Sequence, residues 1–334
     1  MPRQARIDTP GALHHIICRG IERRNIFLAD ADRDAFLLRL SRLLERTTTR
    51  CFAWALIPNH FHLLLQTGTV PIATIMCRLL TGYAVDFNRR HNRIGHLFNN
   101  RYKSILCQKD AYLLELVRYI HLNPLRARIV RNMAELREFP YCGHGALAFD
   151  VATKWQDTEE VMAMFSDFER DAREKYERFV ADGIAAGKQP DLIGGGLVRS
   201  AGGWHVVEDA RRCNTFLKSD ERILGDSDFV EAVLKVANEQ MERRAAYKDS
   251  HIELEQIAYR VAEIFKVDAD RVMKAGKHPD IVQARSVLCF WATRELGMTT
   301  TALGKRIGMS QPAVSRAAER GDELVKENGW QLTE

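Results

Sequence analysis

The chain has 334 residues, 46% of them hydrophobic, so it is long enough for two or three folded domains and too apolar for a disordered protein. Its net charge of +5 is unevenly distributed, because residues 1–150 carry 22 Lys and Arg against 12 Asp and Glu, whereas the remaining residues carry 27 against 32. The basic N-terminal part is therefore the better candidate for contact with phosphates, although a solvated basic surface without a nucleic-acid partner would give the same balance.

Neither a disulfide scaffold nor a membrane protein fits this chain. Its seven cysteines are odd in number and form no CxxC pair, which is typical of reduced thiols in the cytoplasm. The N-terminal residues MPRQARIDTPG contain no apolar signal core, and no apolar stretch is long enough to span a membrane. We expect a cytoplasmic protein without a membrane partner.

Strand-like and helical segments alternate through the first 145 residues. The turn pair Pro58-Asn59 between two apolar runs predicts an antiparallel hairpin. The order of the segments predicts an α+β domain over residues 1–145, in which helices pack on one side of an antiparallel sheet. The expected strands cover residues 11–20, 51–57, 60–67 and 101–108, and the expected helices cover residues 30–46, 71–90 and 110–122.

The rest of the chain reads as helical. Residues 146–250 form a connecting region to which we assign no role, and its Gly-rich run LIGGGLVRSAGGW indicates a linker or turn because it lacks the spacing of a P-loop. Residues 251–334 form a helical domain that ends in a compact basic segment. We expect this last domain to bind DNA.

Two histidines, His60 and His62, lie on the third expected strand. Residues two apart on a strand point to the same face, so the imidazoles lie side by side while Phe61 points into the core. Such a pair is a start for a divalent metal site, although a polar sheet face would also accommodate it.

Four sequence runs give this pair a context. In chain order, they resemble the HUH single-tyrosine transposases, in particular the REP-associated tyrosine transposases, over about the first 130 residues: PGALHHIICRG, IPNHFHLLLQ, GHLFNNRYKSI and RYIHLNPLRA. The resemblance implies a ferredoxin-like nuclease fold, a Mg²⁺ or Mn²⁺ ion at His60 and His62, a homodimer, and cleavage of single-stranded DNA near hairpins.

The same resemblance implies that Tyr119 is the nucleophile and Asn123 a third metal contact, at a place where many relatives carry Gln. The two residues are four apart, so they share a helix face. Structural alternatives remain open. Tyr119 could be a residue at the edge of the core, and Asn123 could cap a following helix that has Pro124 at its first position.

Other polar residues of this part are assigned by position. His14 and His15 are adjacent, so they face opposite ways and at most one can reach the metal; we interpret them as structural or DNA-facing. His121 should point away from Tyr119, because it lies two residues further along a helix. The candidates for phosphate contacts are Arg19, Arg23, Arg24, Arg101 and Lys103.

Residues 299–321 have the pattern of a helix-turn-helix. The buried positions would be Leu303, Ile307 and Val314, with Gly304 and Gly308 at the close packing and the turn. Ser310 can cap the second helix, which has Pro312 in its first turn. That helix would present three side chains to a major groove, Gln311, Ser315 and Arg316.

The stretch 284–324 also resembles the duplex-binding domain of the DnaA-type replication initiator, although it lacks the initiator's Asp-His signature. This resemblance implies binding of double-stranded DNA, but not the same target sequence. An ordinary helical hairpin is the alternative for this stretch.

The sequence therefore predicts a nucleoid-associated enzyme that cuts and joins single-stranded and hairpin DNA through a covalent phosphotyrosine, with a second contact to duplex DNA. A non-catalytic DNA-binding regulator that uses the C-terminal domain is the main alternative. A metal hydrolase is a third, but extra Asp, Glu or His ligands near His60 and His62 are missing from the sequence.

Overall fold

The computed structural model describes residues 7–9, 11–68, 70–149, 153–187, 189, 192, 220, 222–237, 252–274, 276 and 278–332. Every strand and helix expected in the first 122 residues is present, with ends shifted by a few residues. The N-terminal elements are β1 (Leu13–Arg19), η1 (Ile21–Arg23), α1 (Asp30–Thr47), β2 (Arg50–Ile57), β3 (His60–Gln66), α2 (Ile72–Arg90), β4 (Lys103–Cys107), α3 (Lys109–His121), α4 (Asn123–Arg126), α5 (Met133–Glu138), α6 (His144–Phe149), α7 (Glu159–Ala163), α8 (Glu169–Asp182) and β5 (Ile223–Leu224).

A five-stranded sheet forms the centre of this part, in the order β2-β3-β1-β4-β5. Neighbouring strands are antiparallel except for β5, which adds parallel to β4. The β2–β3 hairpin turns at residues 58 and 59, as the sequence predicts. Its register places Ile57 opposite His60 and Ala55 opposite His62.

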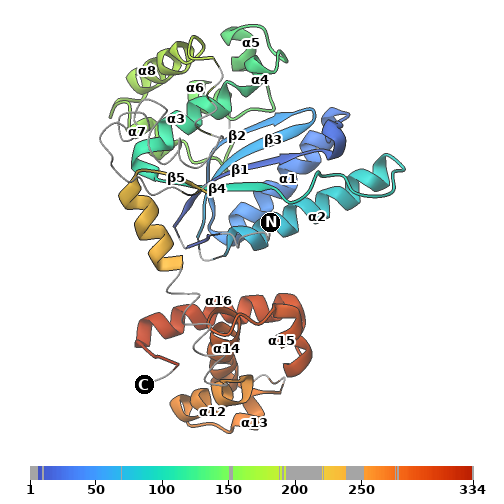
Figure 1. Ribbon diagram of the computed structural model, residues 1–334, viewed down its shortest axis with the longest axis vertical. Coiled ribbons are helices and arrows are strands. Elements are labelled where there is room, and N and C mark those ends of the chain that lie inside the picture. The colour runs from blue at the N-terminus through green and yellow to red at the C-terminus, as the bar shows by residue number, and fades with distance from the viewer. Residues whose placement is uncertain are drawn as a thin grey trace, which may run out of the picture. The chain divides into compact units, whose positions relative to one another are not determined.

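Helices cover both faces of the sheet, so the expectation of helices on one side only is wrong (Figure 1). The face that carries Ile16 and Leu63 packs against α1 and α2. The opposite face, with Leu13 and Leu64, packs against α3 and the helices that follow it. The reason lies in β2, where seven consecutive residues are buried, because an uninterrupted apolar strand requires cover on both sides.

The N-terminus of α1 is held by one buried carboxylate. Asp32 accepts hydrogen bonds from the backbone N–H groups of Leu28 and Ala29 at 2.9 and 3.0 Å, which satisfies donors that the helix leaves open. It also accepts from Arg90 and His91 at the end of α2, at 2.6 and 2.9 Å. Burial alone would raise the pKa of Asp32, but these hydrogen bonds lower it below its ordinary value.

A buried polar network joins α3 to the helices beyond it. The hydroxyl oxygen of Tyr176 on α8 lies 2.8 Å from Nδ1 of His121 on α3 and 2.9 Å from Nδ1 of His144 on α6. None of the three side chains is exposed to solvent. A phenol has one proton, so it donates to one imidazole and accepts from the other. The network therefore ties α6 and α8 to α3, and His121 points away from Tyr119 as expected.

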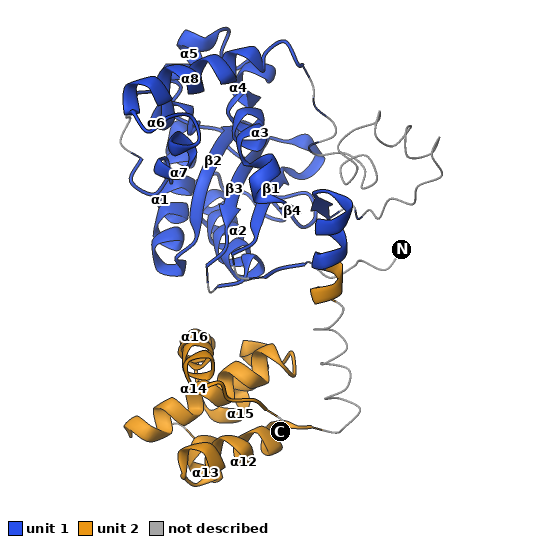
Figure 2. Cartoon of the chain, turned by 90° about the vertical axis from the view of Figure 1, so that its left-hand side faces the viewer, with its two compact units in different colours: residues 1–233 blue, residues 234–334 orange. Residues whose placement is uncertain are grey.

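Contacts divide the chain into two compact units, residues 1–233 and 234–334 (Figure 2), whereas we expected boundaries near residues 145 and 250. The described helices of the second unit are α12 (Leu254–Phe265), α13 (Ala269–Val272), α14 (Pro279–Arg294), α15 (Thr300–Ile307) and α16 (Gln311–Asn328). Its core is apolar and includes the fully buried Trp291. The Gly-rich run LIGGGLVRSAGGW, residues 192–204, lies outside the described residues except for Leu192.

The described part of the chain contains no helix with both the length and the apolarity needed to cross a membrane. None of the six described cysteines forms a disulfide bond, and five of them are buried. Their burial agrees with the expectation that the thiols are mostly packed.

Candidate active site

His60 and His62 project from the same face of the sheet, the face that packs against α3. Their ring centroids are 5.2 Å apart, and the rings are nearly perpendicular. His60 is half-buried at the start of β3, whereas His62 is only 3% exposed. Phe61, between them, packs in the core of the opposite face with α1 and α2. The alternation of a strand thus brings the two imidazoles together, as the sequence predicts.

Both imidazoles are held neutral. Burial and, to a smaller extent, the positive charge of Arg19 together lower the pKa of His60 to about 4. Burial also lowers the pKa of His62 well below its ordinary value, assisted by His15, His60 and Arg19. A neutral imidazole keeps a ring lone pair, which is the form that binds a metal.

Tyr119 faces this pair from α3. Its ring centroid lies 5.8 Å from that of His62 and 5.9 Å from that of His15, both in edge contacts. The side chain is 6% exposed and belongs to the apolar cluster beneath α3, as the structural interpretation of Tyr119 predicts. Burial raises the pKa of Tyr119, and the charges of Arg126 and Arg19 oppose this. Among the described residues, no hydrogen bond holds its hydroxyl oxygen.

Asn123 lies one turn after Tyr119, and its amide nitrogen donates to the carbonyl oxygens of Tyr119 and Ile120 at 3.0 and 3.3 Å. The planar amide then turns its oxygen away from these carbonyls. The expected N-cap role is wrong by one residue, because Leu122 is the N-cap of α4 and Asn123 is its first residue. The helical backbone runs almost unbroken from α3 into α4, since Leu122 has helical dihedral angles.

The donor set fits a small divalent cation. Amide oxygens suit Mg²⁺ and Mn²⁺, and neutral imidazole nitrogens suit transition-metal ions. No cluster of three His, Cys, Asp or Glu side chains with metal-binding geometry occurs in the described part of the chain.

Two of the five residues expected to contact phosphates lie on the strands next to the histidines. Arg19 is paired with His60 across β1 and β3, and Lys103 is paired with Ile17, which in turn is opposite His62. Both are exposed and lie on the face of the histidines. The remaining three candidates are also exposed: Arg23 ends η1, Arg24 follows it, and Arg101 precedes β4.

Sequence reasoning missed two residues at the site, Arg126 and Asn59, and interpreted a third, His15, only as structural or DNA-facing. His15 is buried, and its Nε2 lies 2.9 Å from Nδ1 of His62. The guanidinium of Arg126 covers the ring of Tyr119 at 5.0 Å. Asn59 contacts Nδ1 of His60 through its amide oxygen at 2.6 Å. A signal existed only for Arg126, which lies seven residues after Tyr119 and so two helical turns away on the same face.

In the second unit, α15 and α16 meet at a tight turn. The three expected core positions, Leu303, Ile307 and Val314, are buried. Gly308 ends α15 with a φ of 68°, a conformation that favours glycine. Ser310 is the N-cap of α16, although its side chain forms no capping hydrogen bond. The three side chains expected to face DNA lie in the first two turns of α16, where Gln311 and Arg316 are exposed and Ser315 is half-buried.

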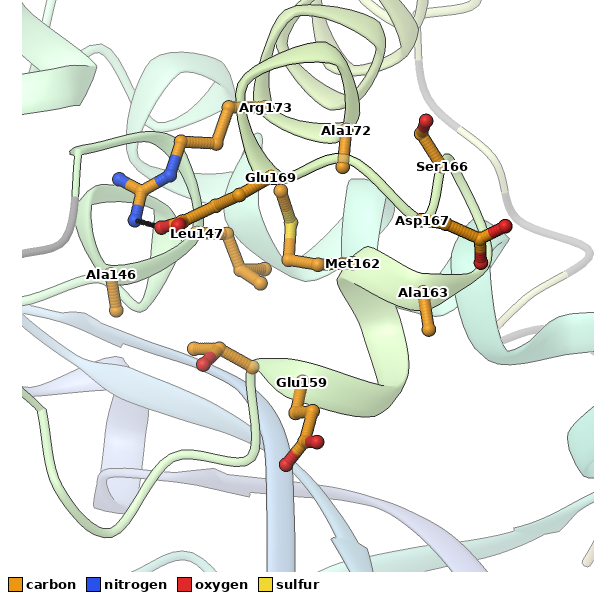
Figure 3. Close-up of a pocket in the computed structure, with 11 residues that line it drawn as sticks. Ala146, Leu147, Glu159, Met162, Ala163, Ser166, Asp167, Glu169, Ala172 and Arg173 are labelled. Atoms are coloured by element: carbon orange, nitrogen blue, oxygen red, sulfur yellow. Dashed lines mark hydrogen bonds and ion pairs between the residues drawn. The ribbon is translucent and has the colours of Figure 1, made fainter.

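A cavity of about 410 Å³ lies between α6, α7 and α8 (Figure 3). Its lining mixes apolar side chains such as Leu147 and Met162 with charged ones, and Arg173 there is paired with Glu169. No residue of the histidine and tyrosine cluster lines it. The cavity is therefore not part of the candidate site.

One protein family and one solved structure are similar to part of the chain. The family described as "Transposase IS200 like" matches residues 10–123, a segment that includes His15, His60, His62, Tyr119 and Asn123. A solved structure of a REP-associated tyrosine transposase bound to a REP hairpin is 16% identical, covers 50% of this chain and 95% of its own, and has a TM-score of 0.38. No curated protein matches the chain. The similarity to IS200-like transposases is thus confined to residues 10–123, and the rest of the chain lies outside the match.

Proposed function

We propose that this protein cuts and rejoins single-stranded DNA, with Tyr119 as the nucleophile and a Mg²⁺ or Mn²⁺ ion held by His60, His62 and Asn123. One observation carries the proposal. The ring of Tyr119 lies 5.8 Å from that of His62, so a phenol and two neutral imidazoles share one face of the sheet. The family of residues 10–123 supports a role in DNA transposition.

The reaction is a transesterification. Oη of Tyr119 attacks the phosphorus, the bond from oxygen to phosphorus forms, and the bond from phosphorus to the 3′ oxygen breaks. The phenol loses one proton and the departing 3′ oxygen gains one, so the step needs no further reactant. A bound metal would polarise the scissile phosphate. The covalent phosphotyrosine conserves the phosphodiester, and a second 3′-hydroxyl can reverse the step and join new ends.

Two cations near Tyr119 would stabilise the negative charge that its oxygen carries during the attack. Arg19 and Arg126 both lower the pKa of the phenol against the effect of burial, so they favour the charge that develops on attack. Exposed cations would bind the phosphate backbone of a DNA strand. Two lie on the face of the histidines, Arg19 and Lys103, and three lie close in sequence to the ends of β1 and β4: Arg23, Arg24 and Arg101. We propose hairpin-flanking single strands as the substrate and a homodimer as the active form.

The test is formation of a covalent adduct. The full-length protein is incubated with Mn²⁺ and labelled single strands that carry hairpins, and adducts are resolved on denaturing gels. We expect an adduct that is lost in Tyr119→Phe, His60→Ala and His62→Ala. Tyr112→Phe is the matched control, because Tyr112 is half-buried on the same helix. An adduct that persists in Tyr119→Phe excludes Tyr119 as the nucleophile.

A second activity is proposed for the C-terminal unit, duplex binding through α16. The observation that favours it is the exposure of Gln311 and Arg316 at the start of a helix that follows a tight turn. A chain that binds duplex DNA but forms no adduct with any hairpin would be a regulator instead of an enzyme. Duplex binding with adduct formation would establish both activities in one protein.

A further inference from the structure

Each of the two histidines proposed as metal ligands has a hydrogen-bonding partner at one of its ring nitrogens. For His60 the partner is the side-chain oxygen of Asn59, 2.6 Å from Nδ1. For His62 it is Nε2 of His15, 2.9 Å from Nδ1. In both cases the contact is made at Nδ1, so in both rings Nε2 is the nitrogen left to bind a metal.

The Asn59 contact fixes the tautomer of His60. The amide nitrogen of Asn59 donates to the carbonyl oxygen of Arg23 at 3.2 Å, which directs the amide oxygen toward His60. An amide oxygen can only accept a hydrogen bond, so Nδ1 of His60 must carry the ring proton. The lone pair of a neutral His60 is then on Nε2.

The contact between His15 and His62 is a buried one. Their rings stack with centroids 5.2 Å apart and an angle of 29° between the planes, and the exposed fractions are 0% and 3%. The β1–β3 register produces this contact, because Ile17 is opposite His62 and His15 lies two residues along β1 on the same face. Of the two nitrogens in the contact, one must donate and the other accept.

We propose that His15 and Asn59 are positioning residues that set the ring tautomers of His62 and His60, so that both Nε2 atoms present lone pairs to the metal. A His62 that binds through Nε2 must carry its proton on Nδ1, and His15 is the acceptor for that proton. Partners of this kind orient metal-binding histidines, and their loss typically weakens metal binding by about 10- to 100-fold. The inference rests on the proposed function for the identity of the ligands.

The first test reads the tautomers in the metal-free, full-length protein. Long-range ¹H–¹⁵N spectra of histidine-labelled protein distinguish a proton on Nδ1 from one on Nε2, and single His variants assign the signals. We expect the Nδ1–H form for both His60 and His62. His15→Phe should move His62 toward the Nε2–H form, whereas His15→Gln, which keeps an acceptor, should not. A wild-type spectrum with Nε2–H at either residue overturns the proposal.

The second test measures Mn²⁺ affinity by electron paramagnetic resonance. We expect His15→Phe and Asn59→Ala to weaken binding about 10- to 100-fold, and His15→Gln and Asn59→Asp to restore it to within a few fold. Asn59 is half-buried in a turn, so its variants should fold even if His15→Phe does not. If Mn²⁺ affinity is unchanged in folded His15→Phe and Asn59→Ala but is lost in His60→Ala, the positioning roles of His15 and Asn59 are excluded and the proposed function is not. Wild-type protein without Mn²⁺ binding would defeat the proposed function, and the tautomer spectra would still decide the roles of His15 and Asn59.

Discussion

Arg126 binds Tyr119 in two ways at once. Its guanidinium lies 5.0 Å from the centre of the phenol ring, and its Nη1 donates to the carbonyl oxygen of Tyr119 at 3.2 Å. The same charge lowers the pKa that burial of Tyr119 raises. One side chain thus both orients the tyrosine and favours its ionised form, because a cation against a phenol stabilises the phenolate.

Replacing Arg126 should slow the attack and change its pH dependence. In Arg126→Gln the pKa of Tyr119 rises further, so we expect adduct formation near neutral pH to slow about tenfold and its pH profile to move to higher pH. Single-turnover rates measured from pH 6 to 10 check this. Arg126→Lys keeps the charge and should keep most of the rate, and Arg128→Gln, on the exposed neighbouring turn, is the control. A profile that stays in place in Arg126→Gln would exclude the electrostatic role.

Asp32→Asn should destabilise the N-terminal unit in a pH-dependent manner. Because the pKa of Asp32 is lower in the folded chain than in the unfolded one, its stabilisation is complete above the unfolded value of about 3.9 and disappears as pH falls through the folded value. We expect a loss of about 1–3 kcal/mol at pH 7 that shrinks below pH 4. Urea unfolding, with hydrogen exchange of residues 28–47 as the local readout, measures it. Asp30→Asn is the control, because the Asp30 side chain is 74% exposed. An equal loss of unfolding free energy in Asp32→Asn at pH 7 and below pH 4 would contradict the prediction.

The C-terminal unit depends on a close helix crossing at Gly321. A Cβ at this position of α16 would overlap the carbonyl group of Ser286 on α14, so Gly321→Ala must push the two helices apart. We expect the unit to lose about 1–3 kcal/mol or more. Thermal unfolding followed by circular dichroism checks this. Gly276→Ala should be nearly neutral, since a Cβ there meets only Arg285 at 3.6 Å; comparable losses in both variants would show that the crossing is not the cause.

Duplex binding should depend on Arg316 more than on other cations of α16. In Arg316→Ala we expect weaker binding to labelled duplex DNA and a salt dependence whose slope falls by about 1, while adduct formation with hairpins persists. Fluorescence anisotropy across a salt series measures this. Lys326→Ala is the control, because Lys326 lies in the last turn and is paired with Asp322 at 2.9 Å. Equal effects of the two substitutions would mean that the chain binds through net charge alone.

Local patterns predicted the elements and the main cluster, but not the contacts between strands. The period of a strand places His60 and His62 on one face, and the period of a helix places Tyr119 one turn before Asn123. The role of His15 depends on the β1–β3 register, and a shift of one residue would turn it to the opposite face. Strand β5 is two residues long and comes from far along the chain, so no local pattern marks it.

The hydroxyl of Tyr176 has a consequence for where this protein can be divided. A fragment that stops at residue 145 would retain His121 but lose Tyr176, and a buried ring nitrogen would then face the space that α8 had filled. Helix α3, which carries Tyr119, would lose the hydrogen bond that joins His121 to Tyr176. A gene fusion that transplanted residues 10–123 alone would therefore carry the chemical groups of the site without the scaffold that keeps α3 in place.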